Sequence, residues 1–270
     1  MTLSPEIVTR NRSFPIPRVS LVIPVFNQQN KISFSLEKIK QAVESAFSDY
    51  ELIVVDDGST DNTLTILRGI TSTDPHIRVL SYTPNRGKGY AVRQGVLHSE
   101  GEAVIFLDGD LDISPDSIKD YVERLSTSDL VIASKRHPES NVRIPRSRRF
   151  LSRAFNLFIR MGTGIPQKDT QAGFKVGNGE IMRAMFRNVS VKRYAFDVEL
   201  FTIASALHLK VQEMPVVMKI DRQFNIKEIV NMLADVTRIC YRHKVLHAYQ
   251  KELPVHLPAK LENNRIQYQR

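Results

Sequence analysis

Short apolar runs alternate with amphipathic segments along the first half of this chain. The runs are rich in Val, Ile and Leu, which indicates strands buried on both faces of a sheet. The intervening segments predict helices because their apolar residues recur with helical spacing. Strands and helices that alternate in this way predict βαβ units and a mostly parallel sheet, an α/β fold. The expected strands lie at 19–27, 51–55, 77–82, 103–107 and 130–133, and the expected helices at 31–47, 63–70, 90–98 and 114–125.

The second half of the chain has a less regular pattern. Residues 136–149 are basic, contain proline and carry few apolar side chains, so we expect a loop there. The segment at 211–220 alternates as a strand does, but Pro215 interrupts it, which predicts an edge position. The other expected elements are a helix at 150–161, a loop at 162–167, a strand or turn opening at 169–174, and helices at 196–207 and 226–247.

Polar side chains stand at the ends of four predicted strands. Because ligands of parallel sheets bind beyond the carboxyl ends of the strands, we expect these clusters to meet in one crevice. It would hold carboxylates for a ribose and a base, a pair of cations, and a metal ion. The clusters are Pro24 with Asn27, Asp56 with Asp57, Arg86 with Lys88, and Asp108 with Asp110.

The sequence Asp108-Gly109-Asp110 is the most informative of these clusters. Two carboxylates just past a buried strand suit a hard cation such as Mg²⁺ or Mn²⁺, which takes oxygen ligands and shares its shell with substrate phosphates. Standing alone, the same residues describe an ordinary turn. Asp112 is either a third metal ligand or an acid that flanks the following helix. Asp56 and Asp57 have a similar alternative, since either could cap the helix that follows them.

These clusters, in this order, resemble the family 2 inverting glycosyltransferases with the GT-A (nucleotide-diphospho-sugar transferase) fold. Residues 169–175 and 194–200 narrow the resemblance to the dolichyl-phosphate glucosyltransferase and mannosyltransferase branch, and to the glucosyl type in particular. The resemblance extends over about residues 19–247. The chain departs from the pattern of that branch at 134–136 and at 224–227.

The resemblance implies roles for particular residues. Pro24, Asn27, Asp56, Asp57, Arg86, Lys88 and Asp108 would bind the nucleotide sugar, and Asp108, Asp110 and Asp112 the metal. Asp110 and Asp169 would take part in the chemistry. Asp169 would deprotonate a hydroxyl acceptor, but would only orient acceptor-binding groups if the acceptor were a phosphate, which is already anionic. The acceptor side would be lined by Lys135, Arg136, Arg148, Gln171, Lys175 and Arg222.

Several of these residues have a plainer interpretation. The basic run that includes Arg148 could be a solvated face, and Lys175 could be a solvated strand residue. Asp197 and Glu199 could pair with the basic loop at 136–149. For the helix at 226–247 we expect core packing in its first half and contact with a membrane interface in its basic second half.

The amino-acid composition restricts the classes of function that this protein can have. The net charge of +9 indicates anionic partners, and no recognised nucleic-acid-binding motif is present, so nucleic acid is not an expected partner. The single Cys240 excludes an internal disulfide. No stretch approaches the roughly 20 apolar residues of a membrane-spanning helix, and the N-terminus carries no apolar signal segment.

We expect one domain at 19–247, between a flexible arm at 1–18 and a polar tail at 248–270. The domain would consist of a nucleotide-binding half (19–135), an acceptor-binding half (136–225) and the amphipathic helix at 226–247.

The sequence therefore predicts a metal-dependent glycosyltransferase. The expected reaction moves glucose from UDP-glucose to a dolichyl or polyprenyl phosphate, with the enzyme docked peripherally on the cytoplasmic face of a membrane. The alternatives are GDP-mannose as donor, a hydroxyl group on a polysaccharide or small polar molecule as acceptor, or a protein that binds nucleotide sugars without catalysis.

Overall fold

The computed structural model describes residues 18–143, 146–167, 169, 172–219, 226–246 and 248–251. A seven-stranded sheet in the order β3-β2-β1-β4-β7-β5-β8 forms its centre. All neighbouring strands are parallel except β7, which runs antiparallel to both β4 and β5. The predicted α/β fold with a mostly parallel sheet is therefore confirmed.

The strands lie close to their predicted positions. Those of the large sheet are β1 (Val19–Val25), β2 (Tyr50–Asp56), β3 (Ile77–Ser81), β4 (Ala103–Leu107), β5 (Leu130–Ser134), β7 (Phe174–Asn178) and β8 (Val211–Pro215). A second sheet pairs β6 (Asn141–Arg143) with β9 (Val217–Lys219). Pro215 ends β8, which occupies one edge of the large sheet, as the sequence predicts.

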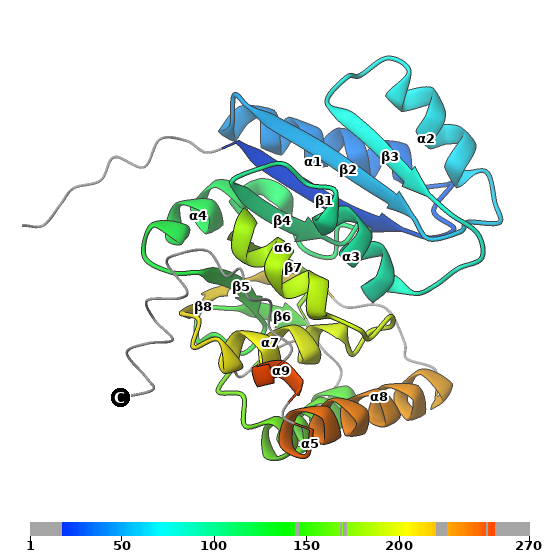
Figure 1. The fold of residues 1–270 in the computed structure, drawn as a ribbon. Helices are drawn as coiled ribbons and strands as arrows, with labels where there is room; N and C mark the ends of the chain where they lie inside the picture. Colours follow the sequence, from blue (N-terminus) through cyan, green and yellow to red (C-terminus); the bar gives the residue numbers. More distant parts are fainter. Residues whose placement is uncertain are drawn as a thin grey trace, which may run out of the picture.

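Helices cover both faces of the sheet (Figure 1). Helices α1 (Ile32–Ala46) and α4 (Ile118–Glu123) pack on one face, and α2 (Thr63–Thr71) contacts α1 and β3. The opposite face carries α3 (Lys88–Leu97), α6 (Gly179–Asn188) and α7 (Phe196–Ala206). Two further helices, α8 (Ile226–Lys244) and α9 (Ala248–Lys251), pack against α7.

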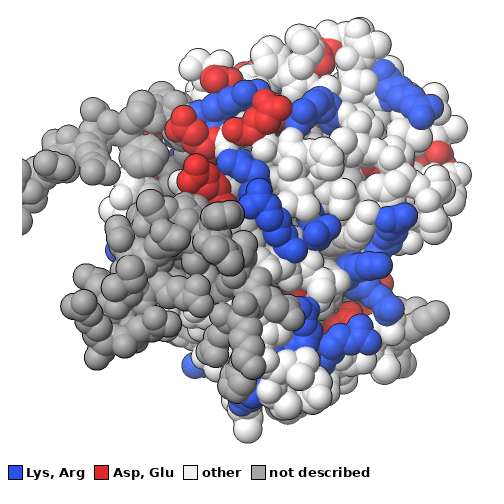
Figure 2. Space-filling model, in the orientation of Figure 1, with Lys and Arg blue, Asp and Glu red and all other residues white. Residues whose placement is uncertain are grey.

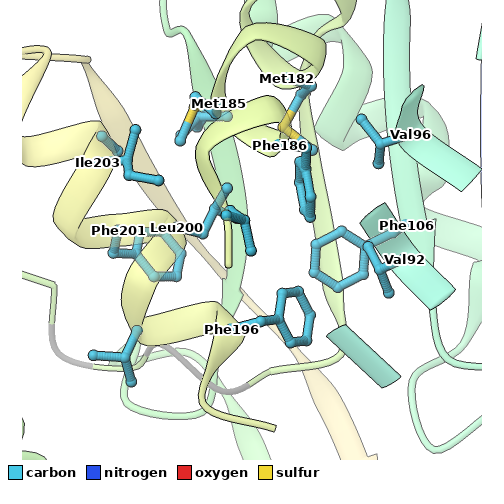
Figure 3. Close-up of a cluster of buried hydrophobic side chains, with 14 of the residues drawn as sticks. Val92, Val96, Phe106, Met182, Met185, Phe186, Phe196, Leu200, Phe201 and Ile203 are labelled. Carbon is cyan, nitrogen blue, oxygen red and sulfur yellow. The ribbon is translucent and has the colours of Figure 1, made fainter. Parts of the chain in front are cut away.

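The hydrophobic core consists of one cluster on each face of the sheet. On the α3 and α6 face, aromatic rings and methionines from both halves of the chain interdigitate (Figure 3). Phe196, from α7, lies with its ring centroid 5.8 Å from that of Phe106 in β4 and 6.3 Å from that of Phe186 in α6. Because β7 also enters the sheet between β4 and β5, the two halves of the chain share one sheet and one core.

Two helices of the second half differ from the prediction. Helix α5 (Arg146–Thr163) begins inside the segment predicted as a loop. Helix α6 was not predicted. Its first residue is capped by Asn178, whose side chain accepts hydrogen bonds from the backbone N–H groups of Glu180 and Ile181.

Core packing in α8 is not confined to its first half, and membrane contact of its second half stays a prediction. Val236 and Ile239, in its second half, are fully buried, whereas Val230 and Leu233 in its first half are exposed. The second half is held because Gly162 of α5 and Cys240 of α8 approach closely, and because the Lys244 ammonium donates to the carbonyl of Met161. No helix in the described part of the chain is long and apolar enough to cross a membrane.

Candidate active site

The end of β1 is tied to the loop that follows β2. Asn27 adopts a left-handed backbone conformation (φ 51°), and its side-chain oxygen accepts a hydrogen bond from the backbone N–H of Thr60 at 2.8 Å. Its own N–H donates to the hydroxyl of Ser59 at 2.9 Å. Pro24 lies inside β1 and not in the turn, at a position where pairing with β4 has already ended at Val22. Its missing N–H therefore costs no bond to β4.

Asp57 organises the loop that carries the predicted Arg/Lys pair. Its buried carboxylate accepts hydrogen bonds from the Tyr82 hydroxyl at 2.8 Å, the Asn85 amide at 2.9 Å, and the backbone N–H groups of Arg86 and Gly87 at 2.9 Å each. The sequence did not single out Tyr82 or Asn85, because their partner lies far away in the chain. Asp57 fixes the walls of the crevice by this means.

Neither Asp56 nor Asp57 caps α2, so that alternative is wrong. Helix α2 begins at Thr63, and Asp61 accepts the hydrogen bond from the Thr63 backbone N–H at 2.9 Å. Asp56 instead accepts from the Ser81 hydroxyl at 3.0 Å and from the Ser59 N–H at 3.2 Å. It thereby joins β2, β3 and the loop between β2 and α2.

Lys88 and Asp108 meet across the crevice. The ammonium of Lys88 lies 2.7 Å from one carboxylate oxygen of Asp108 and 2.8 Å from the other. Burial alone would lower the pKa of Lys88, but Asp108 and then Asp197 outweigh it, and the pKa of Lys88 is raised. Two clusters that are 20 residues apart in the sequence are thus brought together, as predicted.

A second ion pair lies close enough to the first for each pair to influence the other electrostatically. The Lys175 ammonium is 2.8 Å from the Asp197 carboxylate, and only 2% of Lys175 is exposed. Its charge also lies 4.7 Å from the centroid of the Phe106 ring. Burial lowers the pKa of Lys175 and raises that of Asp197, and in each case the partner's charge opposes the shift.

These contacts correct two predictions. Lys175 is neither a solvated strand residue nor exposed on an acceptor wall, because β7 lies in the middle of the sheet. Asp197 and Glu199 do not pair with the loop at 136–149. Asp197 pairs with Lys175, and Glu199 with Arg242 of α8 at 2.8 Å.

The close approach of β7 to Asp108 depends on Gly173. The backbone N–H of Asp108 donates to the Gly173 carbonyl at 3.1 Å, and a Cβ added at Gly173 would lie 1.9 Å from an Asp108 carboxylate oxygen. Glycine is required here by space and not by conformation. The sequence motif contained Gly173, but only the fold gives the reason for it.

The carboxylates predicted to bind a metal follow β4 directly. The chain turns at Leu111, which has a φ of 58°, and one oxygen of Asp110 accepts the backbone N–H of Asp112 at 3.2 Å. Among the described residues, no three acidic, histidine or cysteine side chains converge into a metal-binding group. Asp108, Asp110 and Asp112 therefore do not form a three-ligand shell in this arrangement.

The site nevertheless fits a divalent cation. Its donors are carboxylate oxygens, which Mg²⁺ and Mn²⁺ prefer, and the Asp108 carboxylate already holds the ammonium of Lys88 as a positive charge. Mg²⁺ commonly uses one or two carboxylates and completes its shell with phosphate oxygens and water. Asp110, which is exposed, and Asp108 are the residues that could hold such an ion.

Asp169 is held by the residue that follows β5. Its carboxylate, 2% exposed, accepts the backbone N–H of Lys135 at 2.8 Å and lies 3.6 Å from the ammonium of the same residue. The backbone N–H of Arg136 donates to the Ser134 hydroxyl at 3.3 Å. The structure thus brings together Asp169 and Lys135, which the sequence separates by 34 residues.

Three predicted acceptor-binding side chains cannot be placed. Gln171 and Arg222 lie outside the described residues, and for Arg148 the description covers only its position in α5. The arms predicted at both ends of the chain also lie outside the described ranges, apart from Arg18 and residues 248–251.

The crevice combines features suited to a nucleotide diphosphate. The ammonium of Lys88 stands at the carboxyl edge of a parallel sheet, next to the carboxylates of Asp108 and Asp110, which can accept a divalent ion. Such a set can neutralise a departing diphosphate. Among the described residues, the crevice contains no Ser–His or Cys–His pair that would indicate nucleophilic catalysis by the protein.

Comparisons with known proteins agree with this chemistry. Residues 20–196 match the family described as glycosyl transferase family 2. A dolichyl-phosphate beta-glucosyltransferase of Trichomonas vaginalis is 32% identical over 235 residues, which is 82% of this chain and 70% of that protein. One from Dictyostelium discoideum is 30% identical over 259 residues, 88% of this chain and 79% of that protein.

Solved structures agree in fold. Glucosyl-3-phosphoglycerate synthase from Mycobacterium tuberculosis, in complex with Mn²⁺ and UDP-glucose, superimposes with a TM-score of 0.61. The two sequences are 22% identical, and the match covers 83% of this chain and 79% of the other. The predicted GT-A fold is confirmed by this likeness. With the family match over most of the described domain, the chain belongs to glycosyl transferase family 2 and is a glycosyltransferase.

Proposed function

We propose that this enzyme transfers glucose from UDP-glucose to a dolichyl or other polyprenyl phosphate. The choice of a phosphate as acceptor rests on the surroundings of the Asp169 carboxylate. Its carboxylate is buried and already holds the N–H and ammonium of Lys135, so it is poorly placed to take a proton from a hydroxyl group. A phosphate acceptor needs no such base. The names of the relatives support the same acceptor and sugar.

A divalent cation is the second part of the proposal. When bound, Mg²⁺ or Mn²⁺ would neutralise charge on the departing diphosphate. Asp110 and Asp108 would hold the ion, and Lys88 would then be released from Asp108 to contact phosphate oxygens. Structural neighbours that bind Mn²⁺ with UDP-glucose, and Mg²⁺ with UDP, support this assignment.

Membrane contact is the third part. Helices α5 and α8 pack side by side, and they and the turn after α8 expose large apolar side chains: Leu157, Phe158, Met161, Val230, Leu233, Tyr241, Val245 and Leu246. We refer to these residues as the α5–α8 apolar face. Exposed apolar groups of this extent, beside cationic side chains such as Arg160 and Lys244, suit the interface of an anionic bilayer. A lipid acceptor would be presented at such a surface, on the cytoplasmic leaflet, where anionic lipids concentrate.

Asp110→Ala should reduce glucose transfer by about a hundredfold or more, because the leaving diphosphate loses its cation. The measurement is turnover with UDP-glucose and polyprenyl phosphate at saturating Mn²⁺, with circular dichroism to verify folding. Asp120→Ala, which removes an exposed acid from α4, is the matched control and should behave as wild type. Turnover near the wild-type value in Asp110→Ala would show that the metal is bound elsewhere.

Asp57→Ala and Lys88→Met should each weaken UDP binding by roughly 1–3 kcal/mol. The first releases the loop at residues 85–87, and the second removes a cation from the phosphate region. Calorimetric titration with UDP and Mn²⁺ measures both effects. Lys119→Met, at an exposed position on α4, controls for the loss of charge. Unchanged affinity in both variants would remove the crevice as the nucleotide site.

Asp169→Asn should lower turnover by roughly ten- to a hundredfold because Lys135 loses its partner and the acceptor site is misaligned. The shape of the pH–rate profile should not change, since the second ionisation of the acceptor phosphate, near about pH 6, provides the nucleophile. Profiles of wild type and variant with a polyprenyl phosphate in detergent make the comparison. A hydroxyl acceptor predicts instead that the variant loses the acidic limb, and that result would favour the alternative acceptor.

Leu157→Ser combined with Met161→Ser should weaken binding to anionic vesicles by about tenfold or more, because two apolar side chains no longer enter the interface. Both residues are exposed, at 59% and 72%, so folding should be unaffected. Phe34→Ser, at a residue that is 64% exposed on α1, is the matched control. Flotation on vesicle gradients measures the effect, and equal flotation of the double variant and the control would reject this face as the membrane contact.

A further inference from the structure

A basic pocket lies on the α3 and α6 face of the molecule, with a cavity volume of about 360 Å³. Its walls come from α3, the end of α6, the connection between α6 and α7, and α8. Figure 2 shows Lys and Arg side chains on this face of the molecule, over these elements of Figure 1. The pocket is lined by four cations, Arg93, Arg187, Lys192 and Arg242, together with polar groups of Tyr90, Asn188 and Ser190, and none of its described lining residues is an acid. We refer to it as the α3–α6 pocket.

Most of the positive charge in the pocket is not neutralised by the protein. Arg242 pairs with Glu199 at 2.8 Å. Arg93 uses its Nε to donate to the carbonyl of Phe186 at 2.9 Å. In the ranges that the structure describes, no carboxylate lies within ion-pairing distance of Arg93, Arg187 or Lys192. Like charges held in one concavity repel each other, and an anion bound between them removes that repulsion.

The walls of the pocket are fixed before any ligand arrives. Glu199, fully buried, accepts the backbone N–H groups of Ser190 and Val191 at 2.8 and 2.7 Å, and this holds the connection that carries Lys192. The carbonyl of Lys192 accepts the backbone N–H of Tyr90 at 3.0 Å. Arg242 stacks over the ring of Tyr249, with its guanidinium carbon 5.0 Å from the centroid. A preorganised set of donors loses little entropy on binding.

We infer that the α3–α6 pocket binds a phosphate-bearing anion at a second site, distinct from the reaction crevice. Arginine guanidinium groups match phosphate oxygens in geometry as well as charge. The volume is in the range of small-molecule sites and exceeds the need of a lone inorganic ion, so a phosphate monoester with an attached polar group fits. None of the residues assigned above to the nucleotide or the metal lines the pocket. The same chemistry is available from a soluble phosphate ester or from an anionic phospholipid headgroup.

The test uses the full chain and the double variant Arg187→Gln with Lys192→Gln. Glycerol 3-phosphate is titrated calorimetrically in the presence of saturating UDP and Mg²⁺, so that the crevice is occupied. Vesicles of phosphatidylcholine, with and without phosphatidic acid, form the second arm. The matched control is Arg68→Gln with Lys119→Gln, which removes the same charges from exposed positions elsewhere.

The double variant should raise the dissociation constant of at least one probe by roughly tenfold or more, with UDP affinity unchanged, while the control pair resembles wild type. A loss confined to glycerol 3-phosphate identifies a soluble ester as the ligand class, and one confined to phosphatidic acid vesicles identifies a lipid headgroup. Lys88→Met should lose UDP affinity but keep the probe, which separates this site from the crevice. If neither probe binds, or if the double variant and the control pair are affected equally, the inference is overturned.

Discussion

Two ion pairs that influence each other, Lys88 with Asp108 and Lys175 with Asp197, control the architecture of the reaction crevice. Isolated charges in a protein interior are costly, and a buried pair is tolerated only when geometry is good and further polar contacts are present. Here each lysine is influenced by both carboxylates. The four charges therefore act as one group, and changing one of them alters the environment of the others.

This charged group explains why β7 must return to the middle of the sheet. As an antiparallel strand between β4 and β5, it brings Lys175 to Asp197 and Gly173 against Asp108. The strand thereby connects the half of the chain that carries the nucleotide clusters with the half that carries Asp169. The ammonium of Lys175 lies 4.7 Å from the ring centroid of Phe106 and 5.7 Å from that of Phe201, and both rings belong to the hydrophobic cluster on the α3 and α6 face (Figure 3).

Three parts of the outer surface present different kinds of chemical group. The carboxyl edge of the sheet presents carboxylates, the α5–α8 apolar face presents apolar side chains, and the α3–α6 pocket presents cations. Glu199 links the last two, because it holds both Arg242 of α8 and the connection after α6. One buried acid thus positions elements that belong to two proposed binding surfaces.

The sequence by itself determined the α/β class, most strands, and the polar clusters at the strand ends, because apolar periodicity and local turn chemistry are properties of neighbouring residues. It also contained the motifs that identify the family. It did not reveal that Lys175 is buried, that α8 packs by its second half, or that Asp57 holds the loop at 85–87. Those features were decided by the tertiary structure, since each depends on a partner that the order of the strands brings near. From the sequence alone, a charged side chain is expected to be solvated, because its buried counter-charge is not visible there.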